Sequence, residues 1–335
     1  MNSYDFYRAS GRLGNDQPTE STVLDRYIWA VGAYVLRKVG IHLRTLALLR
    51  VKDLLSTIAR MIKSTRLPAA LLLTLGFSIS PLAGCSDSSS PLRILVTNDD
   101  GVGAEGIDVL VEALIADPNN DVVVSAPAEQ RSGSGDNTIE TRPTCGSGEA
   151  MPSSTASGYD DATWAVDGCP ADAVNYALDP AHGLYEADSL PHVVISGINE
   201  GQNVSAPIAT ELSGTVGAAK TAARDHGIPA LASSQGRPAP DGEYDYPSGA
   251  QAVLTWLAEQ RGTLAAGTVT TEEVDNLNIP SCETGSIRDL VEVPMAESSA
   301  GALDSQDCES ILEDPENDVE ALNNGYTTLG PVPAN

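Results

Sequence analysis

Basic residues are scarce in this sequence, with 19 Lys and Arg against 46 Asp and Glu and a formal net charge of −27. Residues 1–84 hold 11 of the basic residues and only 5 of the acidic ones, so the rest of the chain is more acidic still. Such a surface repels nucleic acid and anionic membrane, because both are bound through a basic footprint. We therefore expect no nucleic-acid partner.

Metal sites built from cysteine and histidine are not indicated either. The four histidines are scattered, and the five cysteines include no C-x-x-C pair. Four cysteines follow Cys85, and an even number in an exported protein suggests disulfides. Three pairings are possible, of which sequence proximity favours Cys145 with Cys169 and Cys282 with Cys308.

The chain has one long uncharged run, LPAALLLTLGFSISPLAG at 67–84, preceded by a short basic stretch. Residues 61–84 therefore have the layout of a secretory signal, with small residues at the cut. The ending Leu-Ala-Gly-Cys resembles a bacterial lipobox, in which the cysteine, here Cys85, is lipidated. We expect an exported, membrane-anchored lipoprotein on the periplasmic side, and Ser86 resembles an outer-membrane sorting signal. The alternative is a transmembrane anchor, for which the run is just long enough.

The expected organisation follows from this signal. A signal peptide opens a chain, so we interpret residues 1–60 as an upstream extension; the alternative is a basic segment lying on or in the membrane. Residues 85–92 would form a tether. Residues 93–335 would form one domain, whose chemistry the motifs described below indicate.

Hydrophobic patterning after residue 93 predicts an α/β fold. Strand, helix and strand at 93–97, 104–116 and 121–127 form a βαβ unit, which implies a parallel sheet with a right-handed crossover. Residues 128–162 are rich in Gly, Ser, Asp and Thr and predict a loop. We expect a doubly wound, mostly parallel Rossmann-like sheet with a loop-rich C-terminal extension. The further predicted strands are 193–196, 229–233 and 276–280, and the further predicted helices are 171–178, 213–224 and 250–259.

The stretch TNDDGVGAEGI at 97–107 carries two conflicting signals. GVGAEG fits G-x-G-x-x-G, the glycine pattern of dinucleotide-binding turns, with Glu129 placed where a ribose-binding acid belongs. Asp99 and Asp100 would then stand beside a pyrophosphate with no compensating charge. A shared divalent cation removes that repulsion, and carboxylate oxygens suit Mg²⁺, Mn²⁺ or Ca²⁺. We therefore interpret the aspartates as the site and the glycines as turn residues, although an aspartate that only caps the next helix is an alternative.

Other polar residues are predicted at the same edge of the sheet, where ligands of doubly wound sheets bind. Ser132 follows the second strand and Asn199 follows the 193–196 strand, although each alone is a common loop residue. Ser213, Gly214 and Thr215 open a helix whose N–H groups would suit a phosphate, and a plain serine cap is the alternative.

Taken together, these segments resemble the SurE family of survival-protein nucleotidases. The resemblance covers about residues 93–330, nearly the whole chain after the signal. Its most specific parts are NDDG and SGIN-x-G-x-N in this order. The matching segments are RILVTNDDGVGAEGI, Arg131-Ser132-Gly133, Gly168-Cys169-Pro170-Ala171-Asp172, Ser196-Gly197-Ile198-Asn199 with Gly201 and Asn203, Ser213-Gly214-Thr215-Val216, Asn276-Leu277-Asn278-Ile279-Pro280 and Asn324-Gly325-Tyr326.

The resemblance implies a metal-dependent phosphatase that acts on nucleoside 5′- or 3′-monophosphates, and sometimes on polyphosphate. It also implies homodimers or homotetramers. The expected chemistry is phosphomonoester hydrolysis by a metal-activated water, with Mg²⁺ or Mn²⁺ as cofactor and Asp99 accepting the proton of the water. The implied metal ligands are Asp99, Asp100, Ser132 and Asn199, and the implied phosphate-binding residues are Asn203, Ser213, Gly214 and Thr215.

Two other functions fit the sequence less well. One is an NAD-binding Rossmann oxidoreductase, and the other is a non-catalytic, surface-anchored protein that binds a metal or phosphate. The chain also departs from the family pattern after NDDG, where Gly103 and Glu105 stand and an extra carboxylate is expected near the phosphate site.

Overall fold

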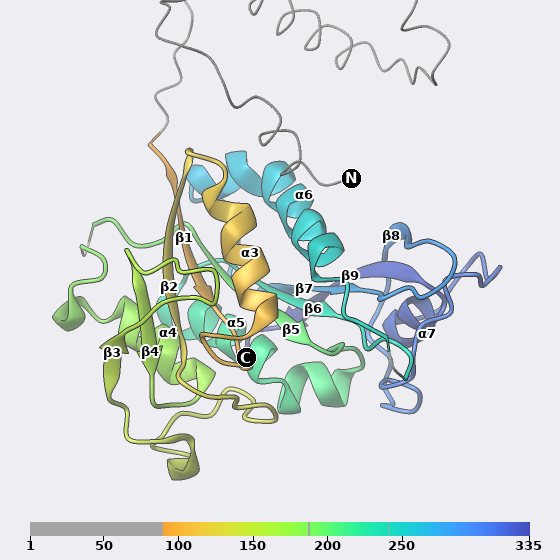
Figure 1. The fold of residues 1–335 in the computed structure, drawn as a ribbon, viewed down its shortest axis with the longest axis horizontal. Helices are drawn as coiled ribbons and strands as arrows, with labels where there is room; N and C mark the ends of the chain where they lie inside the picture. The colour runs from red at the N-terminus through yellow and green to blue at the C-terminus, as the bar shows by residue number, and fades with distance from the viewer. Residues whose placement is uncertain (1–89, 187, 241) are drawn as a thin grey trace, which may run out of the picture. The chain divides into compact units, whose positions relative to one another are not determined.

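A nine-stranded sheet is the centre of the part of the chain that the structure describes, residues 90–186, 188–240 and 242–335. In this computed structural model the strands lie in the order β3-β4-β2-β1-β5-β6-β7-β9-β8 (Figure 1). The strand bounds are Leu92–Thr97 (β1), Asn120–Pro127 (β2), Ala150–Pro152 (β3), Thr163–Val166 (β4), Val193–Glu200 (β5), Ala230–Gln235 (β6), Glu273–Ile279 (β7), Arg288–Glu292 (β8) and Tyr326–Pro333 (β9).

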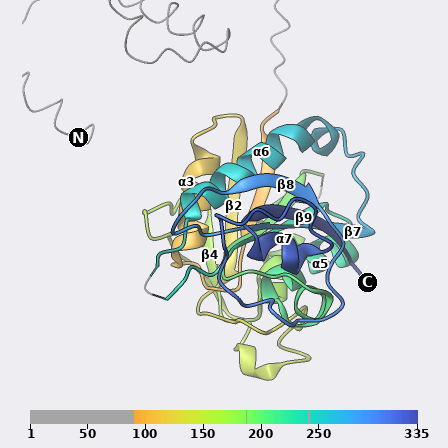
Figure 2. The same ribbon diagram turned by 90° about the vertical axis from the view of Figure 1, so that its right-hand side faces the viewer.

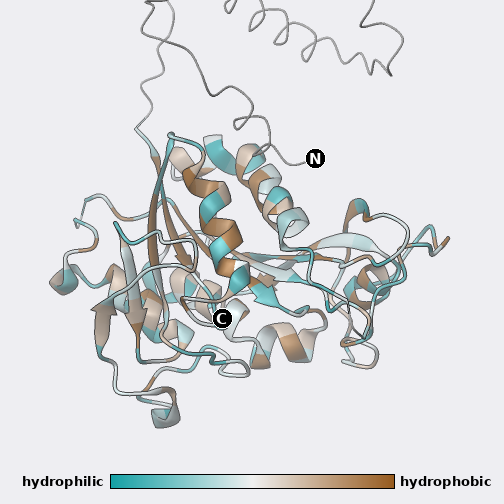
Figure 3. Ribbon diagram, viewed as in Figure 1, coloured by the Kyte–Doolittle hydropathy of each residue, from teal (hydrophilic) through white to brown (hydrophobic). Residues whose placement is uncertain are grey.

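The six strands from β4 to β7 in this order run parallel, as predicted. β3 and β9 run antiparallel to their neighbours β4 and β7, and β8 pairs parallel with β9 at the edge. β1 and β2 are strongly hydrophobic (Figure 3). Parallel strands covered on both faces need such continuous apolar runs, since neither face meets water.

Helices cover both faces of the sheet. α3 and α6 pack together on one face and share a core with β1 and β2 (Figure 1), whereas α4 and α5 pack together on the other face. The fold is therefore a doubly wound α/β sheet of the predicted class. The helix bounds are Glu105–Ile115 (α3), Pro170–Leu178 (α4), Gly214–His226 (α5), Tyr246–Ala265 (α6) and Asp318–Asn323 (α7).

The ends of α5 are set by local chemistry. Ser213 is its N-cap, and the Ser213 hydroxyl accepts a hydrogen bond of 3.0 Å from the Val216 N–H. Gly227 ends the helix with a φ of 66°, a left-handed conformation that favours glycine. The Ser213 cap thus starts α5 beside the carboxyl edge of the sheet, and Gly227 ends it.

The C-terminal part adds the edge formed by β8, β9 and α7, which faces the viewer in Figure 2. Between β8 and α7 the chain is largely irregular, in agreement with the predicted loop-rich extension. The Cys282–Cys308 disulfide links the start of this part to its long loop. The second disulfide joins Cys145 to Cys169, so both bridges connect the pairs that sequence proximity favours.

The structure differs from the expected elements in several places. β5 continues to Glu200, beyond the predicted 193–196, so Asn199 lies within this strand and not after it, and β8, α7 and β9 were not predicted. The predicted loop at 128–162 also contains the short strand β3, and β4 follows directly at Thr163–Val166. α6 extends over Tyr246–Ala265, beyond the predicted 250–259 at both ends. It begins earlier because the Asp245 side chain caps it by accepting from the Ser248 N–H at 3.2 Å.

The predictions for the N-terminal region, namely the extension at 1–60, the signal peptide at 61–84 and lipidation of Cys85, lie outside the described residues. Within the residues that the structure describes, no helix is long and apolar enough to cross a membrane.

Candidate functional site

The ends of β1 and β5 bring the predicted acidic and amide residues together. The two strands are parallel neighbours, and Thr97 pairs with Ser196. The chain after each strand therefore leaves the sheet at the same carboxyl edge. Asp99 and Asp100 follow β1, and Asn199 lies near the end of β5. A direct contact joins the two segments, because the Glu200 N–H donates to Asp100 Oδ2 at 2.8 Å.

Asp99 is buried against the first turn of α5. Its side chain is 3% exposed, and the Thr215 hydroxyl donates to Asp99 Oδ1 at 2.6 Å. Burial raises the pKa of Asp99 above its ordinary value, while the Thr215 hydroxyl and the backbone N–H groups of Thr215 and Gly214 oppose that rise. The start of α5 thus supports this carboxylate, as expected for an anion at a helix N-terminus.

The side-chain oxygen of Asn199 faces the same place. Its Nδ2 donates to the Gly201 carbonyl oxygen at 2.5 Å, which fixes the orientation of the amide. Asn199 Oδ1 then lies 3.0 Å from the Thr215 hydroxyl. That hydroxyl has one proton and also contacts Asp99. One acceptor oxygen from the turn after β1 and one from β5 therefore meet at a single donor.

Asp100 carries the more exposed of the two carboxylates. Its Oδ1 atom is buried without a hydrogen-bond partner among the described residues. Burial, and after it the negative charge of Asp99, raise the pKa of Asp100 to about 7, and the Glu200 charge contributes in the same direction. Glu200 itself is exposed, so it is a third acidic group beside the pair.

No described Lys or Arg forms an ion pair with Asp99 or Asp100. Nor does the described part of the chain contain a group of three or more His, Cys, Asp or Glu arranged to hold a metal. A cation here would therefore use two carboxylates and neutral oxygens. This donor set, with a buried unpartnered Asp100 oxygen, fits a hard cation such as Mg²⁺ or Mn²⁺.

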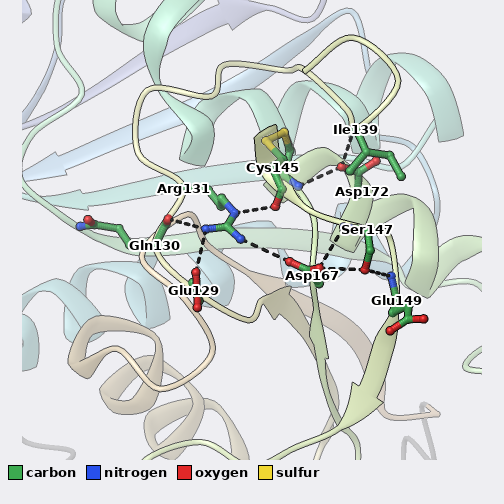
Figure 4. Close-up of polar contacts among 10 residues, drawn as sticks. Glu129, Gln130, Arg131, Ile139, Cys145, Ser147, Glu149, Asp167 and Asp172 are labelled. Carbon is green, nitrogen blue, oxygen red and sulfur yellow. Dashed lines mark hydrogen bonds and ion pairs between the residues drawn. A yellow bond between two sulfur atoms is a disulfide. The ribbon is translucent and has the colours of Figure 1, made fainter. Parts of the chain in front are cut away.

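The loop after β2 carries Ser132, the fourth predicted ligand. Its neighbour Arg131 donates its backbone N–H to the Asp99 carbonyl oxygen at 2.6 Å, which ties the loop to the site. The Arg131 guanidinium points away, toward the Cys145 carbonyl oxygen at 2.8 Å and Asp167 at 3.4 Å (Figure 4). Ser132 itself is exposed, so the structure does not bury it with Asp99.

Two residues further on, Ser134 is buried and 1% exposed. The sequence did not single it out, because a serine in a Gly- and Ser-rich loop has no pattern that marks burial. Its place is set by contacts between the loop and α5 that become visible only in three dimensions.

Asn203, predicted to bind phosphate, is 6% exposed and held by residues of the neighbouring strands. Its N–H donates to Asn278 Oδ1 at 2.7 Å, and its carbonyl oxygen accepts from Asn276 Nδ2 at 2.8 Å. Its amide donates to the Ser234 hydroxyl at 2.9 Å. This network fixes the segment after β5, and it explains why the two Asn of NLNIP stand two residues apart on one side of β7.

The glycines of GVGAEG have structural roles in the turn and the helix. Gly101 has a φ of 106°, a region that side chains rarely adopt. Gly106 lies so close to β5 that a Cβ would be 2.0 Å from the Ile198 carbonyl oxygen, whereas a Cβ on Gly103 would meet nothing within 4 Å. Packing and turn geometry thus account for two of the three glycines of the dinucleotide-like pattern, Gly101 and Gly106.

Fold and site together define a doubly wound α/β protein with an anionic, oxygen-rich site at the carboxyl edge of its sheet. Residues 94–301 match the family model described as survival protein SurE, and this match covers more than half of the chain. The chain belongs to the SurE family.

Curated relatives agree with this assignment. The chain is 31% identical over 255 residues to the 5′-nucleotidase SurE of Brevibacillus brevis, covering 72% of this chain and 90% of that protein. It is 39% identical over 147 residues to 5′-nucleotidase SurE 1 of Chlamydia caviae, a match that spans only 48% of that protein. The crystal structure of the SurE protein of Aquifex aeolicus has the same fold, with a TM-score of 0.54 at 24% identity over 72% of this chain and 94% of that chain.

Proposed function

We propose that this protein hydrolyses the phosphomonoester bond of nucleoside monophosphates. The proposal is supported by the relatives named 5′-nucleotidase SurE and by the geometry of the site. The observation that carries it is the pair Asp99 and Asp100, which lie at a strand end with no described Lys or Arg as ion-pair partner. Such a pair is stable in its charged form only when a cation shares it.

A divalent cation, Mg²⁺ or Mn²⁺, is the cofactor that this donor set suits. Asp99, Asp100, Ser132 and Asn199 would hold it. When bound, such a cation neutralises charge on the phosphate and lowers the pKa of water. Its charge would also oppose the burial and the repulsion from Asp99 that together raise the pKa of Asp100.

Hydrogen bonds that are already made within the site limit which of its groups can bind the phosphate of a substrate. The Thr215 hydroxyl already donates to Asp99, and the backbone N–H groups of Gly214 and Thr215 act to lower the pKa of this carboxyl group. The Ser213 hydroxyl accepts from the Val216 N–H and can still donate its own proton. We therefore assign Thr215 and Gly214 chiefly to holding Asp99, and Ser213 and Asn203 to the phosphate side of the site.

Asp99 is our candidate for accepting a proton from the attacking water. Replacing Asp99 with Asn keeps an oxygen that can accept from Thr215 but removes the charge. Loss of activity in Asp99→Asn with an unchanged melting temperature supports this role. Full activity of the variant contradicts it.

The experiment that tests the proposed function is a phosphate-release screen. Nucleoside 5′-monophosphates, 3′-monophosphates and polyphosphate are each supplied with Mg²⁺, Mn²⁺ or no metal. We expect metal-dependent release from the 5′-monophosphates, with the 3′-monophosphates as further substrates. Binding of nucleotide without phosphate release would favour a non-catalytic binding protein, and a bound NAD(H) signal would favour an oxidoreductase.

We also infer export as a lipoprotein that is anchored through Cys85, and assembly into homodimers or homotetramers. Export is supported by two disulfides, which form and persist in oxidising compartments. Labelling with a radioactive fatty acid tests the anchor, and label that persists in Cys85→Ser contradicts it. Light scattering of the purified protein tests the assembly, and a monomeric mass contradicts it.

A further inference from the structure

A cavity of about 360 Å³ lies at the amino edge of the sheet, opposite the candidate functional site. Arg93, at the start of β1, lines it, as do His192, which directly precedes β5, and Pro229, which directly precedes β6. These three strands run parallel, so their amino ends meet at this edge and their carboxyl ends at the other. The cavity is therefore separate from the site that contains Asp99 and Asp100.

The Arg93 guanidinium lines this cavity without an acidic partner among the described residues. Arg93 is half-buried, and its Nε donates to the Leu190 carbonyl oxygen at 2.8 Å. Asp121, its register partner on β2, and Asp188, which lines the cavity, are both exposed, and neither forms an ion pair with it. The terminal nitrogen atoms of the guanidinium have no acceptor in the described part of the chain, so their N–H groups can bind a ligand.

His192 offers a second donor beside this guanidinium. Its Nδ1 accepts from the Arg93 backbone N–H at 2.9 Å. Burial, and after it the positive charge of Arg93, lower the pKa of His192, so the ring is neutral at physiological pH. A neutral imidazole that accepts at Nδ1 carries its hydrogen on Nε2. Within the described residues nothing accepts from that Nε2–H, which is therefore available to a ligand.

The other walls of the cavity are mostly apolar. Leu264 is 2% exposed and Ile228 is 4% exposed, so both side chains belong to the packed interior. The apolar lining residues are Leu190, Pro191, Ile228, Pro229, Leu264 and Val269. A ligand that suits this cavity thus has an anionic head for the donors and an apolar body for the walls.

Other groups around the cavity limit the charge that it can accept. Gly227 ends α5 and Leu264 lies in the last turn of α6, and the C-terminal end of a helix disfavours an anion. The exposed Asp121 and Asp188 act in the same direction. His226 also lines the cavity, but its Nε2 is already in contact with Asn175 Oδ1 at 2.8 Å, and burial lowers its pKa. A single negative charge is therefore favoured over a phosphate dianion.

We propose that this cavity binds a small organic monoanion, with its carboxylate held by Arg93 and His192 and its apolar body against the walls. The planar guanidinium matches the geometry of a carboxylate, which makes such pairs the strongest hydrogen-bonded ones. The site lies at the opposite edge of the sheet from the proposed nucleotidase centre and goes beyond that function.

Hexanoate is the probe, and its binding is followed by NMR of the Ile228 and Val269 methyl groups in the full-length protein with EDTA and no nucleotide. We expect saturable shifts of these methyl signals and none for Val204, which lies in a separate core cluster. Acetate should bind at least about 10-fold more weakly, because each buried CH₂ adds about four-fold in affinity. Hexanamide, which has no charge, should also bind at least about 10-fold more weakly.

Two variants test the named donors. In His192→Asn the new amide oxygen can still accept from the Arg93 N–H, but the Nε2–H donor is lost, so the Kd for hexanoate should rise about 10-fold. Arg93→Met should raise it further. Arg261→Met is the matched control, since Arg261 is half-buried at the same edge but already paired with Asp117 at 3.2 Å. It should change the Kd less than about two-fold.

Several results would overturn the proposal. These are no saturable shift with hexanoate, equal affinity for hexanamide or acetate, tighter binding of inorganic phosphate, an unchanged Kd in His192→Asn, or an equal loss in Arg261→Met. Melting temperatures show whether any variant is destabilised. The comparison of hexanoate with hexanamide uses the unmodified protein, so it decides the role of the charge even if Arg93→Met does not fold. Phosphate release from nucleotides enters none of these measurements, so failure of the proposed nucleotidase function leaves the result standing.

Discussion

The Thr215 hydroxyl donates to Asp99 Oδ1 at 2.6 Å, joining residues 116 positions apart in the sequence. Asp99 follows the first strand, whereas Thr215 lies in the first turn of α5. The same hydroxyl contacts Asn199 Oδ1, so one donor orients two oxygen ligands of the candidate site. A threonine that organises acceptors in this way is expected to matter for activity more than for folding.

Thr215→Val removes this hydroxyl while keeping its volume. We expect kcat/KM to fall about 10- to 100-fold, as is typical when a group that orients metal ligands is lost. Thr221→Val is the matched control, because Thr221 is buried in the same helix and its hydroxyl bonds only the Gly217 carbonyl oxygen, at 2.9 Å. Equal loss of activity in both variants, at equal melting temperature, would show that Thr215 has no special role.

The Cys145–Cys169 disulfide is expected to support activity as well as stability. It fixes the loop after β2, where Arg131 contacts both the Asp99 carbonyl oxygen and the Cys145 carbonyl oxygen. Replacing both cysteines with Ser should lower the free energy of unfolding by about 3.5 kcal/mol. Phosphate release should also fall when it is measured well below the melting temperature.

The Cys282–Cys308 disulfide is a matched control for the Cys145–Cys169 disulfide. Cys282 and Cys308 are separated by 26 residues and Cys145 and Cys169 by 24, so both bridges close loops of similar length. The Cys282→Ser, Cys308→Ser variant should lose similar stability and keep its activity at low temperature. If it lost as much activity as the first pair, a specific role for the Cys145–Cys169 bridge would be refuted.

Gly106→Ala should destabilise the protein, whereas Gly103→Ala should not. The added Cβ at Gly106 would lie 2.0 Å from the Ile198 carbonyl oxygen and 2.9 Å from Tyr246, and at Gly103 it would meet nothing within 4 Å. We expect a loss of about 1–3 kcal/mol for Gly106→Ala and a change below about 1 kcal/mol for Gly103→Ala. Urea denaturation measures both.

The same two variants test the dinucleotide interpretation of GVGAEG. If its glycines served a pyrophosphate, NAD(H) would bind the unmodified protein and Gly103→Ala would weaken that binding. We expect no fluorescence change on titration of either protein with NADH. Saturable binding that Gly103→Ala abolishes would contradict the assignment of these glycines to turn and packing roles.

The sequence was sufficient for the parts of the fold that depend on local patterns. β1 and β2 are apolar runs, and α3 has a regular apolar face, so their positions were predicted within one residue at each end. β4 was missed because four residues, TWAV, are too short for a period to appear. β9 depends on pairing with the distant β7, which no local pattern reveals.

In the candidate site, too, some features could be predicted from the sequence and others could not. Asp99, Asp100 and Asn199 could be grouped in advance, because parallel strands end at one edge of the sheet. The sequence did not predict that the Thr215 hydroxyl would donate directly to Asp99. Nor did it predict that Ser134 would be buried while Ser132 is exposed. Both depend on how closely the loop after β2 approaches α5. The glycines at 135, 214 and 217 allow this approach because they have no side chains.

The central claim is that a cation shared by Asp99 and Asp100 makes this protein a nucleotidase. Its most direct measurement is phosphate release from a nucleoside 5′-monophosphate with Mn²⁺, then with excess EDTA, then with Mn²⁺ restored. We expect release with Mn²⁺, loss of it in EDTA and recovery on restoring the metal, with Asp99→Asn inactive throughout. Equal release with and without EDTA, or full activity of Asp99→Asn, would contradict the account.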